Sequence, residues 1–199
     1  LNNIDEAKKY LEMSLEKNPN HIDTYLNLSA IYFDKSEFDK SKKYLEAGKK
    51  YIDHTNYNDH KKLCFRLANT YKITGELDKA KLVYEEMYSF DPLNLVVVYF
   101  LYELNAINLD SKLKKKIKLI LKEKKSNHDD QIFGNLLLSK YANKSEKYKD
   151  EYNLLINAHN KIFELKENYF KKRNDLFLST LTNVKQFYDH SVKISVDKK

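Results

Sequence analysis

The chain's two prolines, Pro19 and Pro92, each close a stretch of the same pattern. These stretches read DEAKKYLEMSLEKNP (5–19) and DKAKLVYEEMYSFDP (78–92), so both begin Asp-x-Ala and end in an amide or acidic residue before proline. The prolines lie 73 residues apart, which corresponds to two units of about 34 residues plus about five more. Repetition at that period predicts a stack of similar helical units, because each unit must bury its apolar face against the next.

A looser copy lies between these two stretches. Residues 21–38 read HIDTYLNLSAIYFDKSEF, and residues 61–77 read KKLCFRLANTYKITGEL. The unit that begins at residue 21 continues to residue 53. In it, Ser41 replaces the alanine of Asp-x-Ala, and Asp53 replaces the closing proline. The roughly five additional residues between the prolines lie in the polar stretch HTNYNDH (54–60). Corresponding positions are Tyr25 and Cys64, Leu28 and Leu67, Ser29 and Ala68, Tyr32 and Tyr71, and Ser36 and Gly75.

The scarcity of glycine and proline also favours long helices. With 3 Gly and 2 Pro in 199 residues, the chain lacks the turn residues of a β-sandwich or barrel. Gly48, Gly75 and Gly134 are too far apart for a Rossmann or P-loop nucleotide site. A hydrophobic content of 42% is enough for a packed core. The single cysteine, Cys64, excludes an internal disulfide and a cysteine-based zinc site.

At the repeated positions the sequence resembles the tetratricopeptide repeat family. The first helix of that repeat carries an aromatic residue, then leucine and a small residue, then tyrosine; the second carries alanine, an aromatic residue and a closing proline. The match covers residues 4–92 and implies an all-α fold, a right-handed α-α superhelix of stacked helical hairpins with extra C-terminal helices. The second unit supplies Leu67, Ala68, Tyr71, Gly75, Ala80, Tyr84 and Pro92. It departs from the family pattern at Cys64 and Met87, and the first unit departs at Ser41, Gly48 and Asp53.

The pattern predicts four regions. They are repeats over 1–92, a degenerate helical pair over 93–128, C-terminal repeat-like or capping helices over 129–190, and a tail over 191–199. The valine-rich run LVVVYFLYEL (95–104) is predicted to be helical, because the sequence offers no other strand to pair with it. We expect helices near 4–17, 22–35, 38–52, 58–74, 77–89, 94–107, 110–125, 129–144, 147–167 and 169–189.

A second resemblance concerns residues 131–188. Their order is similar to the repeat segment that precedes the catalytic domain in bacterial repeat–sulfotransferase fusions, with Tyr148 and the stretch Ala158-His159-Asn160 at corresponding positions. The phosphosulfate-binding loop of such a domain is absent. This resemblance implies an alternative function, a non-catalytic N-terminal arm of a larger sulfotransferase.

The family resemblance places a peptide-binding groove along the first helix of each pair. Some members of the family grip a terminal carboxylate with Asn, Lys and Arg, and the matching positions are Asn27, Lys62 and Arg66. Lys62 and Arg66 are spaced i, i+4 and share a helix face, a combination suited to a carboxylate. Asn69 also faces the groove and could bond a peptide backbone. We therefore expect a scaffold or adaptor whose protein or peptide partner has an acidic or carboxylate terminus.

The basic stretch SKLKKKIKLILKEKK (111–125) leaves three interpretations open. Residues 101–199 carry 21 basic and 13 acidic side chains, so this half has a net charge of +8, whereas residues 1–100 have a net charge of −1. Leu113, Ile117, Ile120 and Leu121 form one helical face with lysines around it, which is typical of a stacked surface helix. Phosphate or nucleic-acid binding and membrane-surface binding are the alternatives. Nucleic acid is the weaker one, because aromatic residues for base stacking and arginines for base edges are lacking.

No motif predicts catalysis or a cofactor. The six histidines show no metal-binding spacing, Cys64 falls at a core position, and the acidic pairs Glu85-Glu86 and Asp129-Asp130 point in different directions. The opening LNNIDEAKK shows no signal peptide. The longest apolar run, 95–102, is shorter than a membrane span of about 20 residues. We therefore expect this segment to be a cytoplasmic non-enzyme with no catalytic residue, metal or cofactor.

Overall fold

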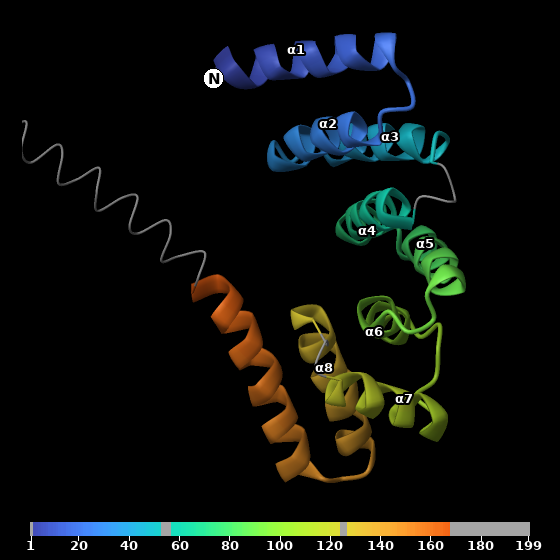
Figure 1. The fold of residues 1–199 in the computed structure, drawn as a ribbon, viewed down its shortest axis with the longest axis vertical. Coiled ribbons are helices and arrows are strands. Elements are labelled where there is room, and N and C mark those ends of the chain that lie inside the picture. The colour runs from blue at the N-terminus through green and yellow to red at the C-terminus, as the bar shows by residue number, and fades with distance from the viewer. Residues whose placement is uncertain (1, 53–56, 124–126, 168–199) are drawn as a thin grey trace, which may run out of the picture. The chain divides into compact units, whose positions relative to one another are not determined.

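The computed structural model describes residues 2–52, 57–123 and 127–167, which contain helices and no strand. The all-α fold expected from the sequence is confirmed. Two compact units divide the chain, residues 1–116 and residues 117–199. In chain order the helices are α1 (Asn2–Lys17), α2 (Ile22–Asp34), α3 (Phe38–Lys49), α4 (Tyr57–Ile73), α5 (Leu77–Phe90), α6 (Leu95–Glu103), α7 (Ser111–Lys122), α8 (His128–Lys144) and a helix over 148–167 (Figure 1).

The helix boundaries follow the sequence pattern to within a few residues, with α6 as the exception. The segment expected to be helical over 94–107 starts where Asn94 caps it, since the Asn94 side chain accepts a hydrogen bond from the N–H of Val97 at 3.3 Å. It ends several residues early because Asn105 has a φ of 53°, a left-handed conformation that cannot continue a right-handed helix. The helix expected over 169–189 lies outside the described residues.

Four helices end in the same left-handed turn. At the end of α2 the N–H of Glu37 donates to the carbonyl of Tyr32, and at the end of α4 the N–H of Glu76 donates to the carbonyl of Tyr71, both at 2.8 Å. Such six-to-one bonds satisfy carbonyls that the helix leaves unpaired and turn the chain back for the next helix. The left-handed residues are Ser36 (φ 59°), Gly75 (77°), Asn105 (53°) and Glu146 (55°), which close α2, α4, α6 and α8.

Within residues 1–116, α2 packs along α3 and α4 packs along α5, so each short turn makes a helical hairpin. The hairpins stack because α3 also contacts α4, while α1 contacts α2 and α5 contacts α6. Their shared core contains Leu45, Leu63 and Tyr84, each at most 1% exposed. Close approach needs small residues: a Cβ atom on Gly48 would lie 2.8 Å from Cγ of Tyr25, so only glycine fits there without a shift.

Serine takes the small-residue positions in the first hairpin. Ser41 donates a hydrogen bond from Oγ to the carbonyl of Ser29 at 2.9 Å, and Ser29 donates to the carbonyl of Leu26 at 2.7 Å. Both serines are fully buried. Because each hydroxyl has an acceptor, serine can replace alanine at this helix contact without leaving an unpaired polar group.

None of the helices in the described ranges combines the length and apolarity needed to traverse a bilayer.

Candidate functional site

A groove lies between the first helices of successive hairpins. It has a volume of about 450 Å³, and most of its wall residues come from α4, with one each from α2, α5 and α6. Stacking of the hairpins places α4 between α2 and α6, and the exposed face of α4 forms the floor of the groove. The lining residues are Leu26, Lys62, Phe65, Arg66, Asn69, Tyr84 and Phe100.

Three of the four groove residues expected from the sequence meet in this groove. Lys62, Arg66 and Asn69 project from the exposed face of α4, at positions i, i+4 and i+7. Asn27 is exposed on α2 but does not line the groove, although its neighbour Leu26 does. The role proposed for Asn27 therefore stays a prediction.

Arg66 is held in place by the first hairpin. Its Nη1 donates a hydrogen bond to the backbone carbonyl of Leu26 at 2.7 Å. That bond crosses from α4 to α2 and fixes where the guanidinium lies. A guanidinium carries five N–H donors, so one bond leaves it able to bind a carboxylate as well.

Among the described residues, Lys62 has only weak partners. Its Nζ lies 4.0 Å from a carboxylate oxygen of Asp23 and 3.9 Å from one of Asp59. The Lys62 side chain is 59% exposed. Exposed ion pairs at the limit of contact contribute little, so a ligand carboxylate can replace these aspartates at small cost.

Aromatic side chains form the apolar part of the groove. The ring of Tyr84 stacks on Phe100 at 5.2 Å between centroids and meets Phe65 edge-on at 6.3 Å. The ammonium group of Lys72 lies over the ring of Phe100, 3.7 Å from its centroid. Burial lowers the pKa of Lys72 below its ordinary value. These contacts hold the aromatic wall rigid, which suits it to receive an apolar side chain.

A second, smaller pocket continues the groove along α2. It has a volume of about 190 Å³ and shares Arg66 and Asn69 with the first pocket. Its other lining residues are Ala30, Phe33 and Asp34, near the C-terminal end of α2. Arg66 therefore stands at the junction of the two pockets, where an extended segment would pass it.

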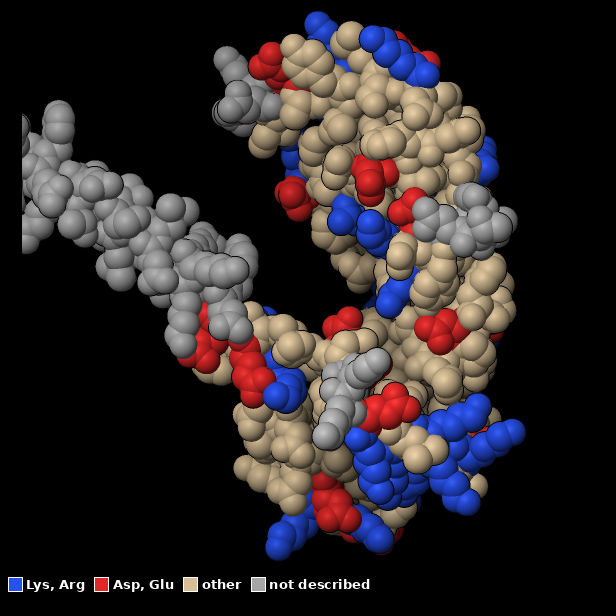
Figure 2. Space-filling model, in the orientation of Figure 1, with Lys and Arg blue, Asp and Glu red and all other residues tan. Residues whose placement is uncertain are grey.

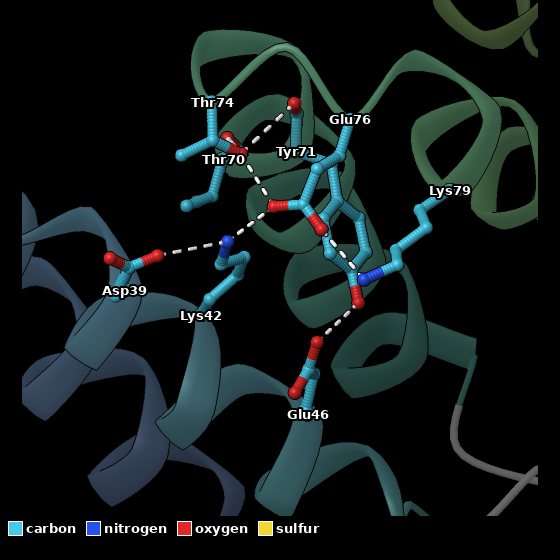
Figure 3. Close-up of polar contacts among 8 residues, drawn as sticks. All are labelled: Asp39, Lys42, Glu46, Thr70, Tyr71, Thr74, Glu76 and Lys79. Atoms are coloured by element: carbon cyan, nitrogen blue, oxygen red, sulfur yellow. Dashed lines mark hydrogen bonds and ion pairs between the residues drawn. The ribbon is translucent and has the colours of Figure 1, made fainter.

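A polar cluster joins the two hairpins beside the groove helices (Figure 3). Lys42 of α3 forms an ion pair with Glu76, which also accepts hydrogen bonds from Lys79 at 2.6 Å and Thr74 at 2.9 Å. Those bonds, with Lys42 contributing most, lower the pKa of Glu76 to about 2. We assign this cluster to scaffolding, because every group in it contacts another member.

Sequence reasoning missed one buried group. His60 and Cys64 on α4 lie beside Glu86 on α5, with candidate ligand atoms all within 4.8 Å of one another. The core position expected for Cys64 is confirmed, since it is 0% exposed. Burial, with a contribution from Glu86, raises the pKa of the thiol to about 12, which disfavours a nucleophilic role. The only signal in the sequence was the spacing His60-x-x-x-Cys64.

The basic stretch forms the amphipathic helix α7. Its one buried residue is Ile117, and lysines occupy the solvent face. Figure 2 shows Lys and Arg side chains gathered over the region where Figure 1 places α7. This is the surface helix that the sequence indicated as one of three interpretations. The other two, phosphate binding and membrane-surface binding, remain predictions.

Comparison with known proteins identifies the hairpins. The sequence model of the tetratricopeptide repeat matches residues 22–51, which contain α2 and α3, and residues 62–92, which contain α5 and all of α4 except its first turn. The crystal structure of MamA is similar in fold, with a TM-score of 0.51 at 13% sequence identity, over 82% of this chain and 91% of that chain. No curated protein matches the chain. The sulfotransferase resemblance of 131–188, which extends past the described residues, stays a prediction.

Proposed function

We propose that this chain, a protein-interaction module built from tetratricopeptide repeats, binds an extended peptide or protein segment along the groove of α2, α4 and α6. Lys62 and Arg66 would pair with a carboxylate of the segment, and Asn69 with its backbone. The observation that carries the proposal is the groove's composition: three polar side chains from one face of α4 stand beside the aromatic wall of Phe65 and Phe100.

The electrostatics of the groove favour an acidic ligand. Arg66 is already oriented by its bond to the Leu26 carbonyl, so a carboxylate that binds it immobilises fewer rotamers. Lys62 can exchange its distant aspartates for the same carboxylate. An apolar side chain next to that carboxylate would rest against Phe65. The preferred ligand is therefore a segment with an acidic residue or free C-terminus beside an apolar residue.

Paired peptides test this chemistry directly. A panel of fluorescein-labelled peptides, each made with a free terminal carboxylate and as the amide, is titrated with the full chain and followed by anisotropy. We expect carboxylate forms to bind better. The double variant Lys62→Gln/Arg66→Gln should weaken the best binder by roughly 10- to 100-fold, because hydrogen bonds to charged groups contribute about 1.5–3 kcal/mol.

The control is Lys61→Gln, which removes one positive charge from the neighbouring position of α4 without changing the groove lining. Thermal melting followed by circular dichroism checks that loss of the Arg66–Leu26 bond has not unfolded the first hairpin. Equal binding by the double variant and the wild type, with both folded, would contradict the groove as the binding site.

A further inference from the structure

Three side chains of different chemistry converge inside the second hairpin. His60 and Cys64 are one helical turn apart on α4, and Glu86 reaches them from α5. Nε2 of His60 lies 3.0 Å from Oε1 of Glu86 and 3.6 Å from Sγ of Cys64. His60 is 2% exposed and Cys64 is 0% exposed, so this group sits in the core of the hairpin.

One nitrogen atom cannot satisfy both of its neighbours by hydrogen bonding. If Nε2 carries the proton, it donates to Glu86 and gives Cys64 no acceptor. If Nε2 is bare, it accepts from the thiol and no longer donates to Oε1 of Glu86, whose other oxygen pairs with Lys49. A cation held by all three atoms satisfies them together. The three donor atoms thus converge as the ligands of a bound ion must.

The two distances from Nε2 of His60 are close to edges of a tetrahedral zinc site. Zinc bonds of about 2.3 Å to sulfur and about 2.0–2.1 Å to nitrogen or oxygen place sulfur and nitrogen about 3.6 Å apart, and nitrogen and oxygen about 3.4 Å apart. The observed separations from Nε2 are 3.6 Å to Sγ and 3.0 Å to Oε1. The third separation, from Sγ of Cys64 to the Glu86 carboxylate, is at most 4.8 Å, so an ion would draw these two side chains together.

We propose that His60, Cys64 and Glu86 form a binding site for Zn²⁺ between α4 and α5. The mixed sulfur, nitrogen and oxygen donors suit this ion, with water as the fourth ligand. On binding, the thiol of Cys64 releases its proton to solvent, and the thiolate and carboxylate together balance the charge of the ion. The sequence alone predicted no metal site, because the chain has a single cysteine and its histidines lack metal-binding spacing. The contact between Glu86 and the two residues on α4 could not be seen in the sequence.

The surroundings leave the site both oriented and accessible. Lys49 of α3 pairs with Oε2 of Glu86, which directs the other oxygen, Oε1, toward His60. An outer partner of this kind fixes the angle of a ligating carboxylate. The Glu86 side chain is 29% exposed, so an ion can enter along it although the other two ligands are buried.

Cobalt provides a specific spectroscopic test, because Cys64 is the only cysteine in the chain. Co²⁺ added to the reduced full-length protein should produce a near-ultraviolet sulfur-to-cobalt charge-transfer band that saturates at one equivalent. Zn²⁺ should then abolish it. Absence of this band would overturn the proposal, and so would a band that Zn²⁺ fails to displace.

Variants assign the remaining ligands. We expect Glu86→Gln and His60→Gln each to weaken Zn²⁺ binding, measured by competition with a chromophoric chelator, by roughly tenfold or more. The controls are Glu85→Gln, an exposed neighbour on the same helix, and His159→Gln, an exposed histidine outside the site. Wild-type affinity in both Glu86→Gln and His60→Gln would show that cobalt binds Cys64 without this site, and would overturn the proposal.

A stability readout covers variants that fold poorly. Zn²⁺ at about a hundredfold excess over its Kd should raise the Tm of the wild-type chain by roughly 5–10 °C, because the ion binds only the folded hairpin. The same addition should leave the Tm of Cys64→Ala unchanged. An equal rise in both proteins would place the stabilising ion elsewhere and contradict this site.

Discussion

The left-handed residues that close the helices set a local limit on stability. Ser36 and Glu146 adopt φ values of 59° and 55°, where a side chain with a Cβ is strained by about 1–2 kcal/mol. Glycine removes that strain but loses more entropy on folding. We expect Ser36→Gly and Glu146→Gly each to stabilise the fold by about 0.5–1 kcal/mol, measured by urea denaturation.

Two other caps provide the controls for this prediction. Asn105 tolerates the left-handed region, so Asn105→Gly should change the free energy of unfolding little. At Gly75 no atom lies within 4 Å of an added Cβ, so Gly75→Ala tests backbone strain alone and should destabilise by about 1 kcal/mol. Destabilisation by Ser36→Gly would show that the serine side chain matters more than its backbone conformation.

At the scale of helices, the contact between the two hairpins depends on pH through Glu76. Lys42, Lys79 and Thr74 lower the pKa of this carboxyl from its ordinary 4.5 to about 2 in the folded chain. A depressed carboxyl pKa stabilises the fold above the unfolded value, and that contribution is lost as pH falls through the folded value. The stabilisation should therefore be complete above about pH 4.5 and disappear toward about pH 2.

The variant Glu76→Gln tests that pH dependence. Its urea midpoint should lie below that of the wild type at pH 6 and approach it as the pH falls from about 4.5 to about 2. The control is Glu85→Gln, whose carboxylate makes an exposed contact with Lys81 at 4.0 Å. A difference that stays constant over this pH range would mean that the charge of Glu76 does not join the hairpins.

Helix positions could be predicted from the sequence because apolar spacing and small residues recur in each unit. The early end of α6 could not be predicted, because asparagine occurs both inside helices and in left-handed turns. The sequence around Asn105 does not indicate which conformation it adopts. Groove residues on α4 were predictable, since Lys62 and Arg66 share a face whatever surrounds it. The contact of Glu86 with His60 was not, because it joins two helices whose packing angle no local pattern specifies.

At the scale of the stacked hairpins in residues 1–116, stability is expected to rise from the outer helix inward. In a repeat array the stability of each unit comes from its own packing and from its contacts with the adjacent units. The helices α4 and α5 contact α3 and α6 as well as each other, whereas α1 packs on α2. Moreover, α1 leaves Ile4, Tyr10 and Met13 between 42% and 62% exposed. Its opening should therefore cost less free energy than opening the second hairpin.

Amide hydrogen exchange measures that gradient. We expect amides of α1 to exchange on the order of 100-fold faster than those of α4 and α5, after correction for intrinsic rates, because helices that open locally lose protection first. Ser36→Gly, which strengthens the turn between α2 and α3, should slow exchange in those two helices and leave α1 unchanged. If α1 were as protected as α4, the hairpins would unfold as one cooperative block, and nearest-neighbour stacking would not describe their stability.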